Sequence, residues 1–147
     1  HERIIDIVRA SSALPFACPI AYVDGKPMID GGIADSIPLQ RALDQGYEHV
    51  IVVLTRHKGY RKKEKPTHIP SFVYRRYPKL REALSTRGAR YNAQVELVEH
   101  LEREGRITVM RPDHPVDVAR IETDMNKMNA LYQHGFEGAE RIIKGEI

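Results

Sequence analysis

The chain has 147 residues, 41% of them hydrophobic and 29% charged, which is the balance of an ordinary soluble globular protein able to enclose one core. No apolar run approaches the roughly 18–20 residues that a membrane-spanning helix needs. A single cysteine, Cys18, excludes an internal disulfide and a zinc site made of cysteines.

The net charge of +3 has its origin in one segment, residues 56–65, which holds six basic residues and one acid. The basic residues are Arg56, Lys58, Arg61, Lys62, Lys63 and Lys65. The rest of the chain keeps 17 basic and 19 acidic residues, a net charge of −2. This distribution argues against a protein-wide surface for nucleic acid, so we expect no nucleic-acid partner. The segment is interpreted as a solvated loop, with attraction to anionic lipid headgroups as the alternative.

The N-terminal residues 2–11 are predicted to form a helix, because Ile4, Ile5 and Val8 recur at spacings of three and four. The small side chains of residues 10–13 indicate that the chain passes close to another segment. Pro15 ends any helix there. Cys18 follows among small and proline residues and is expected to be buried as a small apolar group.

A hairpin is predicted next, because Asp24 and Gly25 lie between two β-prone runs and suit a type I′ turn. Its second strand delivers Asp30 to its end. Gly31 and Gly32 follow and allow positive φ or a close backbone approach. An aspartate at this end of a strand lies where α/β folds place active sites, although a structural turn is the simpler alternative.

The middle of the chain predicts a helix over residues 38–44 and a strand over residues 49–55. That strand is a continuous apolar, β-branched run, which is typical of a parallel strand covered on both faces. The order of helix, strand and helix favours an α/β fold.

The C-terminal half is predicted to be mostly helical, with a helix from Pro78, another over 89–104 capped by Gly105, a strand over 107–110 and a last helix from about residue 123. The buried face of the second helix is predicted from its apolar spacing: Tyr91, Val95, Val98 and Leu101.

Two sequence blocks flank the hairpin and carry a family resemblance: A-S-S-A-L-P-F at residues 10–16 and M-I-D-G-G-I-A-D-S-I-P-L at residues 28–39. Their order and spacing resemble the C-terminal catalytic block of bacterial patatin-like phospholipases over about residues 1–56. The tail resembles the C-terminal extension of one bacterial branch of that family. Its likeness is carried by Tyr77-Pro78, Tyr91-Asn92, Gly105-Arg106, Arg111-Pro112 and Ala130-Leu131-Tyr132.

The resemblance implies a serine acyl hydrolase that cleaves carboxylic esters of lipids through a Ser-Asp dyad, a function in lipid degradation. Asp30 matches the dyad aspartate, and Gly31 and Gly32 match the glycines that shape its loop. The matching serine would lie in an upstream G-x-S-x-G elbow, and these residues contain neither that elbow nor the glycine-rich oxyanion loop. We therefore expect this piece alone to be inactive. Residues 35–38, D-S-I-P, differ from the Asn-Asn-Pro of plant members.

The expected architecture is α/β, the C-terminal part of a three-layer α/β/α sheet. Residues 1–65 are assigned to the catalytic domain and residues 66–147 to a mostly helical extension. Residue 1 is His and leads directly into an amphipathic segment, so we expect the chain to be a piece of a longer polypeptide that needs the upstream half of its own domain. We expect a cytoplasmic protein without a cofactor, and the spacing of the seven histidines predicts no metal site.

Two other functions stay open at this point. One is a non-catalytic interaction or regulatory domain built on the same scaffold, since fold does not determine function. The other is a nucleic-acid binder that acts through residues 56–65, which predicts an affinity that falls steeply with salt. A G-x-S-x-G elbow encoded upstream would favour the enzyme.

Overall fold

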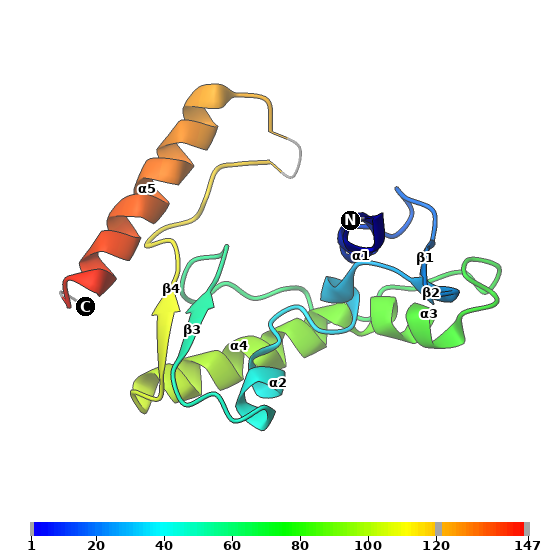
Figure 1. The fold of residues 1–147 in the computed structure, drawn as a ribbon, viewed down its shortest axis with the longest axis horizontal. Helices are drawn as coiled ribbons and strands as arrows, with labels where there is room; N and C mark the ends of the chain where they lie inside the picture. Colours follow the sequence, from blue (N-terminus) through cyan, green and yellow to red (C-terminus); the bar gives the residue numbers. More distant parts are fainter. Residues whose placement is uncertain (1, 120–121, 146–147) are drawn as a thin grey trace. The chain divides into compact units, whose positions relative to one another are not determined.

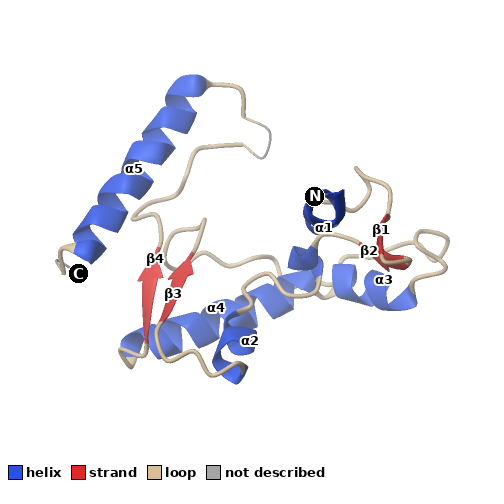
Figure 2. Cartoon of the chain, in the orientation of Figure 1, coloured by secondary structure: helices blue, strands red, loops and turns tan. Residues whose placement is uncertain are grey.

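The computed structural model describes residues 2–119 and 122–145, which form a mixed α/β structure (Figures 1 and 2). The elements in chain order are α1 (Glu2–Ser11), β1 (Ala21–Val23), β2 (Lys26–Met28), the 3₁₀ helix η1 (Gly31–Ile33), α2 (Leu39–Asp44), β3 (Val50–Val53), α3 (Pro78–Ser85), α4 (Arg87–Arg103), β4 (Ile107–Met110) and α5 (Met125–Ile143). This agrees with the α/β class expected from the sequence, and the three-layer arrangement stays a prediction.

The chain divides into two compact units, each built from two separate stretches. The first unit combines His1–Pro38 with Lys62–Val95, and the second combines Leu39–Arg61 with Glu96–Ile147. Each unit therefore takes residues from both sides of position 65, and the predicted assignment of domains on either side of that position stays a prediction.

The hairpin of the first unit forms as predicted. Strands β1 and β2 pair antiparallel, with Ala21 opposite Met28 and Val23 opposite Lys26. Asp24 and Gly25 both have positive φ, 50° and 73°, as a type I′ turn requires. The Asp-Gly pair is thus sufficient to determine this turn.

Helix α1 has the predicted bounds, but its apolar face is exposed. Ile4 and Ile5 are 64% and 65% exposed, whereas Ala10 and Ala13 are buried. The helix contacts β1. The small residues at the end of α1 are thus the ones that pack against other segments. Ile4 and Ile5 have no apolar cover from the described part of the chain.

The prediction that Cys18 is buried was wrong, because its side chain is exposed. The chain reverses direction at Phe16, whose φ is 67°. The amides of Ala17 and Cys18 both donate to the carbonyl of Leu14, which closes the turn. A turn of this kind lies on the surface, where a small apolar side chain gains no burial.

In the second unit β3 and β4 pair in parallel, in a register that places Val50 beside Ile107. Burial alternates along β3: Val52 is buried, whereas Ile51 and Val53 are 64% and 70% exposed. The prediction of a parallel strand is confirmed. The described residues cover only one face of β3, so the prediction of cover on both faces stays a prediction. The buried apolar residues of this unit are Leu39, Val52, Leu54, Val98, Leu101 and Ile107.

The C-terminal helices begin and end close to the predicted positions. Pro78 opens α3, and Gly105 follows α4 with a φ of 68°. Asp124 caps α5 by accepting a hydrogen bond from the amide of Asn126. Over residues 2–119 and 122–145, no helix is both long enough and apolar enough to span a bilayer.

Helix α4 also holds the end of the basic segment in the first unit. The buried side chain of Asn92, 3% exposed, accepts a hydrogen bond from the amide of Lys62 and donates to the carbonyl of Lys62 and to the carboxylate of Glu64. A Cβ atom on Gly88 would lie 2.1 Å from the carbonyl oxygen of Lys63. Glycine at position 88 is therefore required by the close approach of another backbone.

We predict that Gly88→Ala destabilises the protein by about 1–3 kcal/mol, because the added methyl group displaces the backbone of Lys63. Gly135→Ala is the matched control, since Gly135 lies inside α5 and its added Cβ meets no atom within 4 Å. Helix propensity alone stabilises that variant by about 0.5–1 kcal/mol. Urea unfolding measures both, and equal effects of the two substitutions would contradict the close approach.

Candidate functional site

Asp30 is held through its main chain and its side chain. Its amide donates to the carbonyl oxygen of Ala13 at 3.0 Å, which ties the A-S-S-A segment to the D-G-G motif. Its carboxylate caps η1, with Oδ1 accepting a hydrogen bond of 2.8 Å from the amide of Gly32. The half-buried carboxylate therefore has a determined orientation within its loop.

The two glycines of the motif serve a purpose other than the expected positive φ. Neither Gly31 nor Gly32 has a positive φ, because the chain continues into the right-handed turn of η1. A Cβ atom on Gly32 would lie 3.1 Å from Oδ1 of Asp30, whereas one on Gly31 would meet nothing within 4 Å. Gly32 thus makes room for the carboxylate, and Gly31 is not sterically required.

Serine hydroxyls in this region bond to main-chain carbonyls. Ser36 donates to the carbonyl of Gly32 at 2.7 Å, and Ser12 donates to the carbonyl of Val8 at 2.9 Å. Within the described ranges, no serine hydroxyl forms a hydrogen bond with Asp30. The structure thus brings together Asp30, Gly31 and Gly32, and Ser36 supports the loop.

Three side chains of α4 contact the same loop, and sequence reasoning missed them. Arg87 donates to the carbonyl of Gly32 at 3.2 Å, and Arg90 donates to the carbonyl of Ala34 at 3.3 Å. Gln94 donates to the Asp35 carboxylate and also accepts a hydrogen bond from the amide of residue 37. The signal in the sequence was a set of polar residues at spacings of three and four in the first half of a helix.

The basic segment is partly engaged in internal contacts. Arg61 donates two hydrogen bonds to the carboxylate of Glu99, at 2.7 and 3.2 Å. The ammonium of Lys62 lies 3.8 Å from the ring centre of Tyr91, and the guanidinium of Arg56 lies 5.0 Å from that of Tyr60. The interpretation as a fully solvated loop is thus too simple. Contact with anionic lipid stays a prediction, which sedimentation with anionic vesicles would test.

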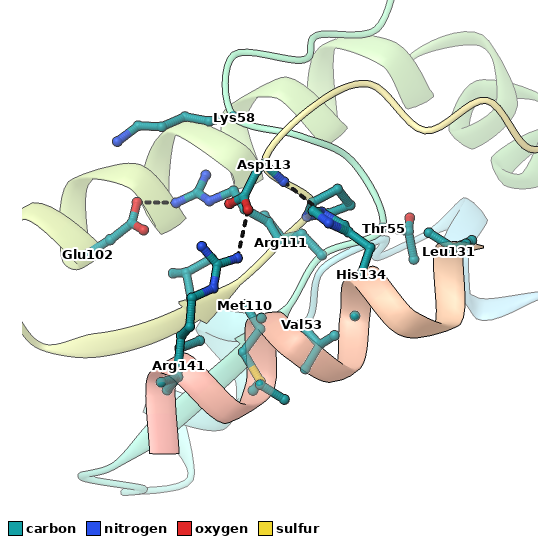
Figure 3. A pocket seen from close by; sticks show the side chains of 17 residues that line it. Val53, Thr55, Lys58, Glu102, Met110, Arg111, Asp113, Leu131, His134 and Arg141 are labelled. Atoms are coloured by element: carbon teal, nitrogen blue, oxygen red, sulfur yellow. Dashed lines mark hydrogen bonds and ion pairs between the residues drawn. The ribbon is translucent and has the colours of Figure 1, made fainter. Parts of the chain in front are cut away.

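The second unit contains a cavity of about 620 Å³ on one side of α5 (Figure 3). Its lining is mostly apolar and includes Leu131 and Met110. Four of the charged residues at the cavity pair with one another: Arg141 with Asp113 at 2.6 Å, and Arg111 with Glu102. The size suits a small molecule, but Asp30 does not line the cavity and no serine does.

Metal chemistry has no candidate ligand set among residues 2–119 and 122–145. No group of three or more His, Cys, Asp or Glu side chains lies close enough together in those ranges to hold an ion.

Comparison with known proteins divides the chain into two matched stretches. Residues 1–43 match the family model of patatin-like phospholipases, and residues 77–145 match a domain of unknown function, DUF6363. The chain is also 40% identical over 55 residues to the uncharacterized protein YjjU of Escherichia coli (strain K12), a match that covers 37% of this chain and 15% of that protein. The first match contains the D-G-G motif and supports a patatin-like hydrolase family for the N-terminal residues.

The pair formed by Arg61 and Glu99 gives a pH-dependent prediction. Hydrogen bonds from Arg61 lower the pKa of Glu99 and outweigh partial burial, which alone would raise it. A lowered folded-state pKa contributes stability above the unfolded pKa, and this contribution is lost as the pH falls through the folded-state pKa. We expect Arg61→Ala to lower stability by up to about 1 kcal/mol at neutral pH.

Urea unfolding between pH 3 and pH 7 measures this effect. The difference in unfolding free energy between wild type and Arg61→Ala should shrink as the pH falls below the usual pKa of a glutamate and through the lowered folded-state pKa of Glu99. Glu99→Gln is the control, because it removes the titrating group and should remove the pH-dependent part of the difference. A difference that is the same at every pH would assign the effect to packing of the Arg61 side chain.

Proposed function

We propose that this chain is part of a lipid acyl hydrolase of the patatin-like type, which cleaves carboxylic esters, and that Asp30 is the base of its Ser-Asp dyad. The observation that carries the proposal is the Asp30 carboxylate, oriented by the Gly32 amide at 2.8 Å within the stretch that matches patatin-like phospholipases. The same activity covers phospholipids and simpler esters, which share the reacting carbonyl group.

The proposed chemistry uses the two carboxylate oxygens differently. Oδ1 of Asp30 accepts the hydrogen bond from Gly32, and Oδ2 has no hydrogen-bond partner within the described ranges. A serine hydroxyl is a weak nucleophile and needs an adjacent base, which a carboxylate about 2.6–3.2 Å away can provide. Oδ2 would take the serine proton as the serine oxygen attacks the ester carbonyl.

The remaining steps follow from that proton. Protonated Asp30 donates it to the leaving alcohol as the ester C–O bond breaks, which leaves the acyl group on the serine. Asp30 then accepts a proton from water as the water oxygen attacks the acyl carbonyl. It returns that proton to the serine oxygen as the acyl–serine bond breaks, which releases the acid and restores the free serine and the Asp30 carboxylate. Backbone amides outside this chain would stabilise the oxyanion.

The nucleophile is proposed to lie on another segment of the protein, because none of the five serines in this chain is part of a G-x-S-x-G elbow. The exposed apolar side chains of α1 and β3 support a missing partner, since Ile5 and Val53 are at least 65% exposed. We propose that the segment with the serine covers such apolar surface. Alone, these 147 residues should therefore hydrolyse no ester.

The first test is Asp30→Asn in the full-length protein that contains both this chain and the elbow serine. Asparagine caps a helix as well as aspartate does, so the loop should keep its fold. We expect hydrolysis of short and long p-nitrophenyl esters to fall by about 10²–10⁴-fold, the usual contribution of a general base.

Circular dichroism is the control for folding of the Asp30→Asn variant. Unchanged hydrolysis would make Asp30 a structural turn residue and refute the dyad. If the folded wild type hydrolysed neither ester, the non-catalytic interaction domain would be the better interpretation.

A second test uses the two glycines of the motif as a matched pair. Gly32→Ala places a methyl group 3.1 Å from Oδ1 of Asp30, so the carboxylate must move. We expect kcat to fall by about tenfold, since small displacements of a catalytic group are costly. Gly31→Ala adds the same atom in open space and should leave kcat within about twofold of wild type. Equal kcat values for the two variants would contradict the steric role of Gly32.

A further inference from the structure

The loop after the hairpin is irregular beyond η1, yet its polar groups are paired with side chains of α4, beside which it runs (Figure 1). The carbonyls of Gly32 and Ala34 and the carboxylate of Asp35 accept hydrogen bonds from that helix. The amide of Ile37 donates to it. Every contact lies inside the first compact unit.

The three contributing residues, Arg87, Arg90 and Gln94, lie at spacings of three and four and thus share one face of α4. The helix rises about 1.5 Å per residue, so they span about 10 Å of its axis. Their partners follow the same order along the loop, from Gly32 at one end to Ile37 at the other. The helix therefore holds the loop along its length.

Two of the three side chains make more than one contact. Arg90 also donates to the carbonyl of Ala83 at 2.6 Å, which links α3 to the loop. Gln94 uses both ends of its amide, donating to Asp35 and accepting from Ile37. The amide can do both, whereas the carboxylate of a glutamate has no donor and would repel Asp35.

The contact of Arg87 is the one nearest to the candidate catalytic group. Arg87 donates to the carbonyl of Gly32, the residue whose amide orients the carboxylate of Asp30. Ser36 donates to the same carbonyl at 2.7 Å. Both peptide groups of Gly32 are therefore hydrogen-bonded: its N–H to Asp30 and its carbonyl to α4.

We propose that Arg87 and Gln94 are positioning residues for the catalytic loop, so that α4, which lies within the stretch matched as a domain of unknown function, is part of the active-site structure. The proposal rests on the proposed function of Asp30. It assigns a role in the reaction to residues outside the stretch that matches patatin-like phospholipases.

The variants that test this are Arg87→Ala and Gln94→Met in the full-length protein, with Glu96→Met as the control. Met keeps the length of Gln94 and removes both hydrogen bonds. Glu96 is exposed on the same helix and has no hydrogen bond or ion pair among the described residues. Arg87→Lys retains a donor for the carbonyl of Gly32.

We expect kcat for ester hydrolysis to fall about tenfold in Arg87→Ala and Gln94→Met, with KM within about twofold, because the base is misplaced while the acyl site is intact. Arg87→Lys should recover part of kcat, and Glu96→Met should equal wild type. If the substitutions acted only by destabilising the protein, the loss of activity in each variant would instead follow its loss of stability. Unchanged kcat in folded variants would overturn the proposal.

Hydrogen exchange gives a readout that does not depend on activity. The amide of Gly32 should exchange at least about tenfold faster in Arg87→Ala and Gln94→Met than in wild type, because its hydrogen bond to Asp30 loses support. Unchanged exchange at Gly32 would overturn the positioning role even if Asp30→Asn abolished hydrolysis. Faster exchange combined with an inactive wild type would refute the proposed function and, with it, a role of these residues in catalysis.

Discussion

The hydrogen bonds between α4 and the loop after β2 are the constraint on which the candidate site depends. A loop of this kind needs partners for its backbone groups, and neither strand pair of the described residues includes it. Arg87 and Gln94 provide them at two places on the loop. Because the partners are side chains of one regular helix, their positions relative to one another are set by the helix itself.

A second set of hydrogen bonds, within the D-G-G motif and to Ala13, orients Asp30 itself. Asp30 bonds to Ala13 through its amide and to the amide of Gly32 through one carboxylate oxygen. This arrangement keeps the other oxygen available while the side chain is oriented. A general base needs both properties. One oxygen must be free to accept the proton, and the side chain must be fixed within hydrogen-bond distance of the group that donates it.

The same helix holds a second segment through different residues. Asn92 satisfies both backbone groups of Lys62, and Gly88 permits the close approach of Lys63. A buried amide with all of these bonds made stabilises the contact, whereas an unpaired one would be costly. Two loops that are distant in sequence, after β2 and at Lys62, thus receive hydrogen bonds from α4, and these contacts join C-terminal residues to a motif from the N-terminal residues.

The sequence by itself determined the features that depend on neighbours in the chain. The Asp24-Gly25 turn, the buried face through Val95 and Val98, and the turn at Gly105 that follows α4 depend on local dihedral preferences and helical periodicity. Resemblance of motifs singled out Asp30, whose dyad role stays a proposal.

Only the tertiary structure decided the features that depend on contacts between distant residues. These are the exposure of Cys18, the uncovered side of β3, the steric reason for glycine at position 32 and the partners that α4 supplies. Whether a side chain is covered, and which group it meets, depends on long-range packing that overrides local preference, and no spacing along the chain encodes it directly.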